Sequence, residues 1–328
     1  MINEKMNNIS EENKYNILLI ITDQERNNEW IPKSVNLPGR ERLKSRSLSF
    51  NNHYTHTSPC SPSRATIFTG KYIHQHGVKE NSSTNNNTQL NTGYLTLGKS
   101  LKDLGYYTAY KGKWHLQSKP QPQMEEFGFA DWFGNDMSFW GLPNSGTEYD
   151  PLIYKETYQW LKNHSHDKKP YMNCSQITKS LSSHTDLART IIDLAGGSDH
   201  QLENFEGKSL TRLLNDPSKT VRNSVYFAQE WPWYPGVEKV RYANTGYFDG
   251  KINYSRYYGI GGGVTNLGLK NNKKMRVTKD SKFDDFEHEL YDLSVDPHEI
   301  NNIGYKRNSN KKFLKRYFNN LNELESSL

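Results

Sequence analysis

The segment SPCSPSRATIFTG, residues 58–70, contains the residues around which we expect the chain to fold. Its first half is a proline-punctuated loop. Ser61-Pro62 then suits a helix N-cap followed by the first helical position, and Gly70 suits a C-terminal cap. Cys60 is therefore predicted just before a helix N-terminus, where free N–H groups and the helix dipole favour an anion. Because Arg64 can reach the same place, the segment indicates a site for a sulfate or phosphate ester; a buried structural cysteine is the alternative.

Two motifs carry a resemblance to a known family. The order C-S-P-S-R-A-x-x-x-T-G, from Cys60 to Gly70, resembles the defining motif of the formylglycine-dependent sulfatases. A second block of that family, G-Y-x-T-x-x-x-G-K-x-H, is matched from Gly105 to His115. In the family, a separate formylglycine-generating enzyme oxidises the motif cysteine to an aldehyde, whose hydrate is the nucleophile. The resemblance extends from about residue 14 to 303, and a long central stretch of the family is missing near 174–183.

The resemblance implies catalytic roles for four residues of this chain. Cys60, oxidised to formylglycine, would supply the nucleophile, and Arg64 would stabilise it. Lys113 matches a lysine that contacts the sulfate. His115 matches a group that acts as a base when the sulfated intermediate breaks down. The implied function is hydrolysis of a small-molecule sulfate ester.

A divalent cation, usually calcium, is the cofactor that the resemblance implies. Asp23, Gln24 and the modified Cys60 would hold it, because calcium prefers oxygen ligands. Gln24 replaces an aspartate of many members, as in choline-sulfatase-like and phosphonate-hydrolase-like branches. The later Asp-Asn or Asp-His metal pair and a substrate-binding lysine belong to the missing stretch. We therefore expect weak metal binding and low activity.

Two other functions stay open. One is hydrolysis of a phosphonate monoester or phosphodiester at the same site, which Gln24 favours. The other is a catalytically impaired sulfatase-like protein. Two further residue pairs are weaker candidates for chemistry: Asp199-His200 lies in a polar loop, and His184 with Asp186 lies at a helix start, where capping is the expected role.

Hydrophobic patterning predicts an α/β fold. The apolar run 15–22, followed by Asp23, is typical of a central parallel strand buried on both faces, with a functional carboxylate or a helix-capping Asp at its end. We expect a mainly parallel sheet between helices, a shortened alkaline-phosphatase-like sulfatase fold, over a domain at 14–220. A small antiparallel sheet and a helix form a second subdomain at 221–328. The expected helices are 39–47, 95–104, 154–162, 183–196 and 313–324; the expected strands include 49–54, 106–110, 169–174, 225–227, 239–242, 247–248, 251–254 and 289–293.

Composition excludes several classes of function. The chain has 328 residues and a formal net charge of +6, without a basic helix or a nucleic-acid motif. No apolar run approaches the roughly 20 residues that span a membrane. We therefore expect neither nucleic acid nor a membrane as partner, and the lack of an apolar leader within residues 1–13 favours a cytoplasmic location. The two cysteines, Cys60 and Cys174, do not make a disulfide framework.

Overall fold

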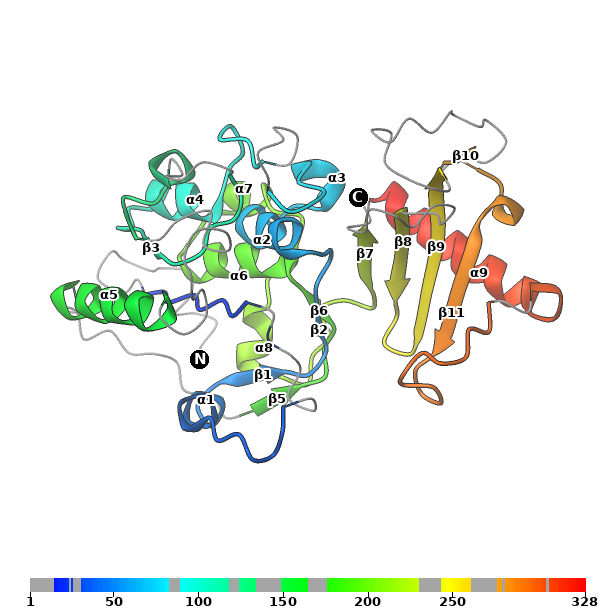
Figure 1. Ribbon diagram of the computed structural model, residues 1–328, viewed down its shortest axis with the longest axis horizontal. Coiled ribbons are helices and arrows are strands. Elements are labelled where there is room, and N and C mark those ends of the chain that lie inside the picture. The colour runs from blue at the N-terminus through cyan, green and yellow to red at the C-terminus, as the bar shows by residue number, and fades with distance from the viewer. Residues whose placement is uncertain are drawn as a thin grey trace.

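The computed structural model describes most of the chain between Tyr15 and Leu328. Helices and parallel strand pairs lie on one side of the molecule, and an antiparallel sheet with a long helix lies on the other (Figure 1). This arrangement agrees with the predicted α/β fold class. None of the described helices is long and apolar enough to cross a membrane. The described residues are 15–23, 25, 31–82, 89–117, 124–133, 149–164, 176–229, 243–260, 276–278, 281–304 and 307–328.

The parallel strands form three separate pairs among the described residues. The pairs are β1 (Leu48–Phe50) with β5 (Gln176–Thr178), β2 (His53–Tyr54) with β6 (Ser182–Ser183), and β3 (Ala109–Lys111) with β4 (Asp131–Phe133). The strand predicted over 49–54 is thus divided into β1 and β2 by a turn. The expected strands 169–174 and 239–242 lie outside the described residues.

The predicted central strand at 15–22 is not formed. Ile17 and Ile21 pack against the main core, but the side chains between them face solvent. Leu18 is 53% exposed and Ile20 is 69% exposed. The prediction of burial on both faces is therefore wrong, because no described strand pairs with this segment.

The five predicted helices are all present, with ends that differ from the prediction by up to six residues, and Asp199-His200, expected in a polar loop, begins a short helix. In the predicted helix at 183–196, only residues 185–194 are helical, and Gly196 follows the end. The nine helices described in the structure are α1 (Pro38–Lys44), α2 (Cys60–Thr69), α3 (Ile73–His76), α4 (Leu97–Asp103), α5 (Tyr149–His164), α6 (Thr185–Leu194), α7 (Asp199–Leu202), α8 (Thr211–Asn215) and α9 (Arg307–Ser326).

The main core joins α2, α4 and α6 around a group of aromatic rings. Trp114, 1% exposed, packs against Phe68 of α2 and against Phe127, with ring centroids 4.8 and 5.1 Å apart. Ile192 of α6 is fully buried in the same cluster. Because Trp114 follows Lys113 directly, this core fixes the backbone that carries the second predicted motif.

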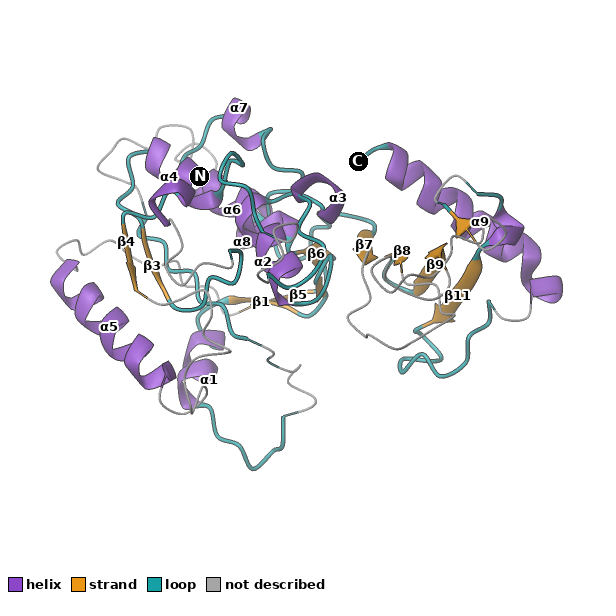
Figure 2. Cartoon of the chain, turned by 45° about the horizontal axis from the view of Figure 1, so that its top comes forward, coloured by secondary structure: helices purple, strands orange, loops and turns teal. Residues whose placement is uncertain are grey.

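The C-terminal sheet has the strand order β10-β9-β8-β7, and β11 also pairs with β9. Asp249-Gly250 forms the predicted hairpin turn between β8 and β9, and Oδ1 of Asp249 accepts hydrogen bonds from the backbone of Lys251 and Ile252. Helix α9 covers one face of the sheet (Figure 2). The strands are β7 (Val225–Gln229), β8 (Ala243–Phe248), β9 (Ile252–Ile260), β10 (Arg276–Val277) and β11 (Glu287–Asp292).

A buried histidine joins the two parts of the molecule. Nδ1 of His56 lies 3.2 Å from the carbonyl oxygen of Tyr226 in β7. Its Nε2 accepts a hydrogen bond of 3.1 Å from the backbone N–H of Ile73 in α3. Since Nε2 is the acceptor, Nδ1 carries the proton of the neutral ring and donates it to Tyr226. His56 therefore connects α3 to the antiparallel sheet.

Candidate active site

Cys60 is the first residue of α2 and is half-buried. The predictions that Ser61 caps this helix and that Cys60 precedes it are wrong, because the helix begins two residues earlier than predicted and Pro59 occupies the N-cap position. The hydroxyl of Ser61 donates instead to the carbonyl oxygen of His115 and accepts from the backbone N–H of Ser82 at 2.9 Å. The predicted C-terminal cap is confirmed: Gly70 has φ +62°, a conformation that glycine adopts without a Cβ penalty.

Asn81 takes the place of the missing cap. Its Oδ1 accepts a hydrogen bond of 3.1 Å from the backbone N–H of Ser61. Together with the bonds of Ser61, this contact ties three segments of the chain around the start of α2. The segment from Asn81 onward looks like an exposed loop by composition, so the sequence gives no signal for this role.

Arg64 lies one turn after Cys60 and is directed into the protein, with 7% of its side chain exposed. Its Nη1 donates to the carbonyl oxygen of Lys113 at 2.6 Å, and its Nη2 lies 3.4 Å from Oδ1 of Asp23. The hydroxyl of Tyr110 donates to the same carbonyl of Lys113. Arg64 therefore connects the first motif, the second motif and Asp23.

The second motif leaves β3 through a glycine. Gly112 has φ +122°, and its N–H bonds to the carbonyl of Phe133 at 2.7 Å. Beyond it, Trp114 enters the core, and Nζ of Lys113 reaches Asp23 at 3.1 Å. His115 has φ +59°, a conformation that costs a non-glycine residue about 1–3 kcal/mol and that concentrates at functional sites.

The charges around Asp23 keep it ionised. Burial raises the pKa of Asp23, but the hydrogen bond and charge of Lys113, followed by those of Arg64, outweigh burial, so the pKa lies below its ordinary value. The two cations therefore meet a carboxylate rather than a carboxylic acid.

His115 is held in its neutral form. Burial, followed by the charges of Lys113 and Arg64, lowers the pKa of His115 to about 4. Its Nδ1 is buried and has no hydrogen-bond partner among the described residues. The neutral imidazole keeps one unprotonated nitrogen, and the two neighbouring cations oppose its protonation.

The described residues do not fit a calcium site. Calcium takes 6–8 oxygen ligands, whereas the site offers the single carboxylate of Asp23, already in contact with Lys113 and Arg64. No group of three or more His, Cys, Asp or Glu side chains that could hold a metal occurs within the described ranges. Gln24 lies outside them. Asp199-His200 forms the exposed start of α7, which Ser198 caps.

Comparison with known proteins identifies the family. Residues 15–177 match the sulfatase family model. N-acetylglucosamine-6-O-sulfatase of Bacteroides thetaiotaomicron is 35% identical over 144 residues, which are 43% of this chain and 23% of that protein. The multifunctional alkaline phosphatase superfamily protein PehA of Trinickia caryophylli is 35% identical over 117 residues, 33% of this chain and 21% of that protein. Over the matched stretch, the chain belongs to the sulfatase family.

Solved structures share the same fold over most of the chain. A structure with bound D-glucosamine-2-N,6-O-disulfate as its substrate has a TM-score of 0.56 at 17% identity, covering 88% of this chain and 92% of that one. Phosphonate monoester hydrolase of Silicibacter pomeroyi has a TM-score of 0.57 at 12% identity, covering 89% and 91%. The alkaline-phosphatase-like sulfatase fold is therefore confirmed. The aligned sequence spans less than a quarter of the length of these two curated relatives.

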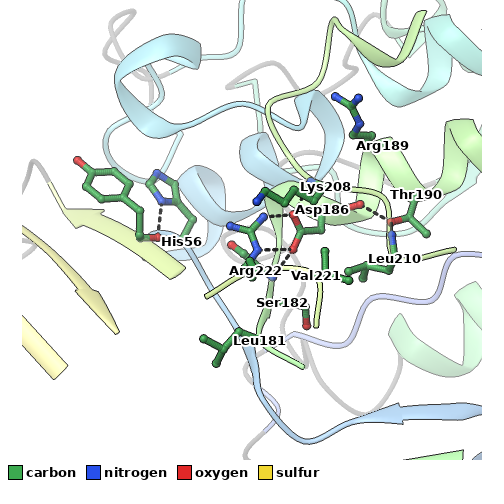
Figure 3. A network of polar contacts seen from close by, with 12 residues as sticks. His56, Leu181, Ser182, Asp186, Arg189, Thr190, Lys208, Leu210, Val221 and Arg222 are labelled. Atoms are coloured by element: carbon green, nitrogen blue, oxygen red, sulfur yellow. Dashed lines mark hydrogen bonds and ion pairs between the residues drawn. The ribbon is translucent and has the colours of Figure 1, made fainter. Parts of the chain in front are cut away.

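The structure places one further set of polar residues beside the sulfatase motif. The predicted capping role of His184 is wrong: it occupies the N-cap position of α6 but makes no side-chain cap bond, and its Nδ1 lies 3.0 Å from the hydroxyl oxygen of Ser63 in α2. Asp186, which is fully buried, accepts hydrogen bonds from the guanidinium of Arg222 and from the backbone N–H of Lys208 at 2.7 Å (Figure 3). Sequence reasoning missed both contacts, because each joins residues far apart in the chain.

Proposed function

We propose that this chain hydrolyses sulfate esters, with Cys60 as the nucleophile after oxidation to formylglycine. The observation that carries the proposal is the convergence of Arg64, Lys113 and His115 at the start of the helix that begins with Cys60. Matches to the sulfatase family over residues 15–177 support it.

The side chains divide the chemistry among them. Arg64 and Lys113 supply two positive charges that can stabilise the non-bridging oxygens of a sulfate group. His115 is the proposed base that takes up the proton released when the sulfated intermediate breaks down, and a sulfate bound by Lys113 and Arg64 would offset the charges that lower its pKa. Formylglycine at Cys60 would supply the hydrated aldehyde that attacks sulfur. Because the described donors do not fit calcium, we assign no step to a metal ion.

The proposed substrate is a sulfate ester of a small alcohol. The name of the Bacteroides relative makes the 6-sulfate of N-acetylglucosamine the first sugar ester to test. The proposed partner during maturation is a formylglycine-generating enzyme, because Cys60 begins an intact C-S-P-S-R motif.

The test has two stages. The chain is produced with and without a formylglycine-generating enzyme, and mass spectrometry of the Cys60 peptide measures conversion. The matured chain is then assayed against a sugar sulfate, an aryl sulfate and an aryl phosphonate, with Cys60→Ala as the control. Hydrolysis of a sulfate that requires both maturation and Cys60 supports the proposal. Faster hydrolysis of the phosphonate would favour the alternative reaction, and full conversion without any turnover would identify a catalytically impaired member.

A further inference from the structure

The backbone of His115 is strained and is held from both sides. Its φ of +59° is sparsely populated by residues with a side chain, and such strain persists only where the surrounding structure over-determines the backbone. Trp114, directly before it, is 1% exposed, and Leu116, directly after it, is fully buried. The carbonyl of Leu116 accepts a hydrogen bond of 2.8 Å from the backbone N–H of Leu90. The chain is thus anchored on either side of the strained residue.

Ser61 makes a further contact with this backbone. Ser61 is fully buried and follows Cys60 directly in the first turn of α2. Its hydroxyl donates to the carbonyl oxygen of His115 and accepts a hydrogen bond of 2.9 Å from the backbone N–H of Ser82. Both directions are fixed, because a carbonyl oxygen only accepts and a backbone N–H only donates. The hydroxyl of Ser61 therefore binds the backbone of His115 to the residue next to Cys60.

The conformation of His115 decides where its imidazole lies. The charges of Lys113, Arg64 and Asp23 all act on the half-buried ring, so the ring lies among them. Nη1 of Arg64 is bound to the carbonyl oxygen of Lys113 at 2.6 Å. These two cations are held by their own contacts and would not follow the imidazole. Relaxation of His115 to an ordinary negative φ would therefore move its ring relative to them.

We propose that Ser61 is a positioning residue for His115: its hydroxyl holds the carbonyl of His115 and thereby keeps the imidazole beside Lys113 and Arg64. The same bond ties the proposed base to the helical turn that begins with the proposed nucleophile, Cys60. Small errors in the placement of reacting groups cost a large part of a rate, so such a tie has a catalytic effect. The role in catalysis rests on the proposed function, whereas the hold on His115 does not.

The test follows the His115 ring by NMR titration between about pH 8 and 5. Burial, followed by the charges of Lys113 and Arg64, lowers the pKa of His115 to about 4, so in the unaltered chain the ring should stay neutral over this range. Its signals are identified by their loss in His115→Gln. Ser61→Ala should release the ring and bring its titration into the range, towards the ordinary pKa near 6.5. Ser61→Thr keeps the hydroxyl and should titrate like the unaltered chain.

Ser82→Ala is the matched control. Oγ of Ser82 is buried and has no hydrogen-bond partner among the described residues, and the backbone N–H that reaches Ser61 is kept in the variant. The titration of His115 should therefore stay unchanged. Asn81→Ala removes the oxygen that accepts from the backbone N–H of Ser61 at 3.1 Å, at a less buried position. It should shift the titration in the same direction as Ser61→Ala, and it is the variant to measure if Ser61→Ala does not fold.

Turnover of the matured chain gives a second readout. Ser61→Ala should lower kcat about two- to tenfold, the effect of one lost hydrogen bond, and leave KM nearly unchanged. The proposal would be overturned by a His115 ring that stays neutral over the whole range in folded Ser61→Ala, or in Asn81→Ala if Ser61→Ala is unfolded. An equal shift in Ser82→Ala, or an unchanged kcat in Ser61→Ala, would also overturn it. Failure of the sulfatase proposal appears elsewhere, as an absence of maturation or turnover, because the titrations need neither.

Discussion

Nζ of Lys113 lies 3.1 Å from Oδ2 of Asp23, and Nη2 of Arg64 lies 3.4 Å from Oδ1 of the same carboxylate. Two cations from the two sulfatase motifs thus converge on one anion. A divalent cation that bound Asp23 would have to displace both of them. A sulfate group that bound the cations would compete with Asp23 for the same contacts.

Calcium binding should therefore be weak. Titration calorimetry is expected to give a dissociation constant of about 10⁻⁴ M or weaker, because affinity follows the number of charged ligands and only one carboxylate is available. Lys113→Met should tighten binding by freeing Oδ2 of Asp23, and Asp23→Asn should weaken it. Submicromolar binding by the unaltered chain would contradict this prediction.

Lys113 should matter for turnover more than for folding. Loss of one charge-assisted contact costs about 1.5–3 kcal/mol, so Lys113→Met should lower kcat/KM about tenfold to a hundredfold against a sulfate ester. Lys111 offers a matched control, since its Nζ lies 2.6 Å from Oδ1 of Asp131. Lys111→Met should leave kcat/KM nearly unchanged. If both variants lose activity and melting temperature to the same degree, Lys113 is a structural residue.

Arg64 should behave differently from Lys113. It is nearly buried and bonds to the carbonyl of Lys113, so it supports the local backbone as well as the site. Arg64→Met should lower both the melting temperature and the turnover. Thermal unfolding measured beside the ester assay separates the two residues.

The buried ion pair of Asp186 and Arg222 should dominate local stability. Asp186 is fully buried and Arg222 is 8% exposed. Breaking such a pair by Asp186→Asn should lower the free energy of unfolding by about 3–5 kcal/mol, because the guanidinium is left buried without its counter-ion. The exposed pair of Lys311 and Asp284 is the comparison, and Asp284→Asn should cost less than about 1 kcal/mol. Urea unfolding measures both variants, and equal losses would contradict the prediction.

Stability should fall on mild acidification. Burial, opposed in His56 by the bond to Tyr226, lowers the pKa of both His56 and His76 to about 3. The unfolded chain, with histidine pKa values near 6.5, takes up protons first as the pH falls. The contribution of each residue is complete above about pH 6.5 and is lost between that value and about 3, by up to roughly 1.4 kcal/mol per pH unit.

Urea unfolding at several values between pH 7 and 4.5 tests this slope. The charges of His74 and, for His56, of His184 act in the same direction, so single variants are compared with the double variant. The double variant His56→Gln/His76→Gln should flatten the dependence of the free energy of unfolding on pH. His74→Asn, at an exposed position, should change that dependence little. An unchanged slope in the double variant would count against the histidines.

The sequence predicts helices and motifs better than strand pairing. The periodicity of α2 and α6, the C-terminal cap at Gly70 and the Asp249-Gly250 turn depend on neighbours in sequence, so they could be predicted. The strand at 15–22 needed a partner strand, and hydropathy alone does not reveal whether one is present. The same limit explains why burial on both faces was wrongly predicted for that segment.

In the candidate site, too, local motifs could be predicted from the sequence, whereas contacts between distant residues could not. The motifs predicted Cys60, Arg64, Lys113 and His115, and the structure brings the last three around Asp23. Their roles stay predictions until activity is measured. The bond of Ser63 to His184 joins positions 121 residues apart, and no local pattern of composition or spacing encodes such a contact.

Leu18 is 53% exposed and Ile20 is 69% exposed, on a segment whose Ile17 and Ile21 pack against the core. Burial of such side chains releases about 25 cal/mol per Å² of apolar surface, and an extended backbone can add hydrogen bonds to that gain. This segment, rather than the charged site, should therefore set the concentration at which the protein begins to self-associate. Handling the protein dilute, or replacing Ile20 by lysine, should keep it monomeric while the chemistry at Cys60 is studied.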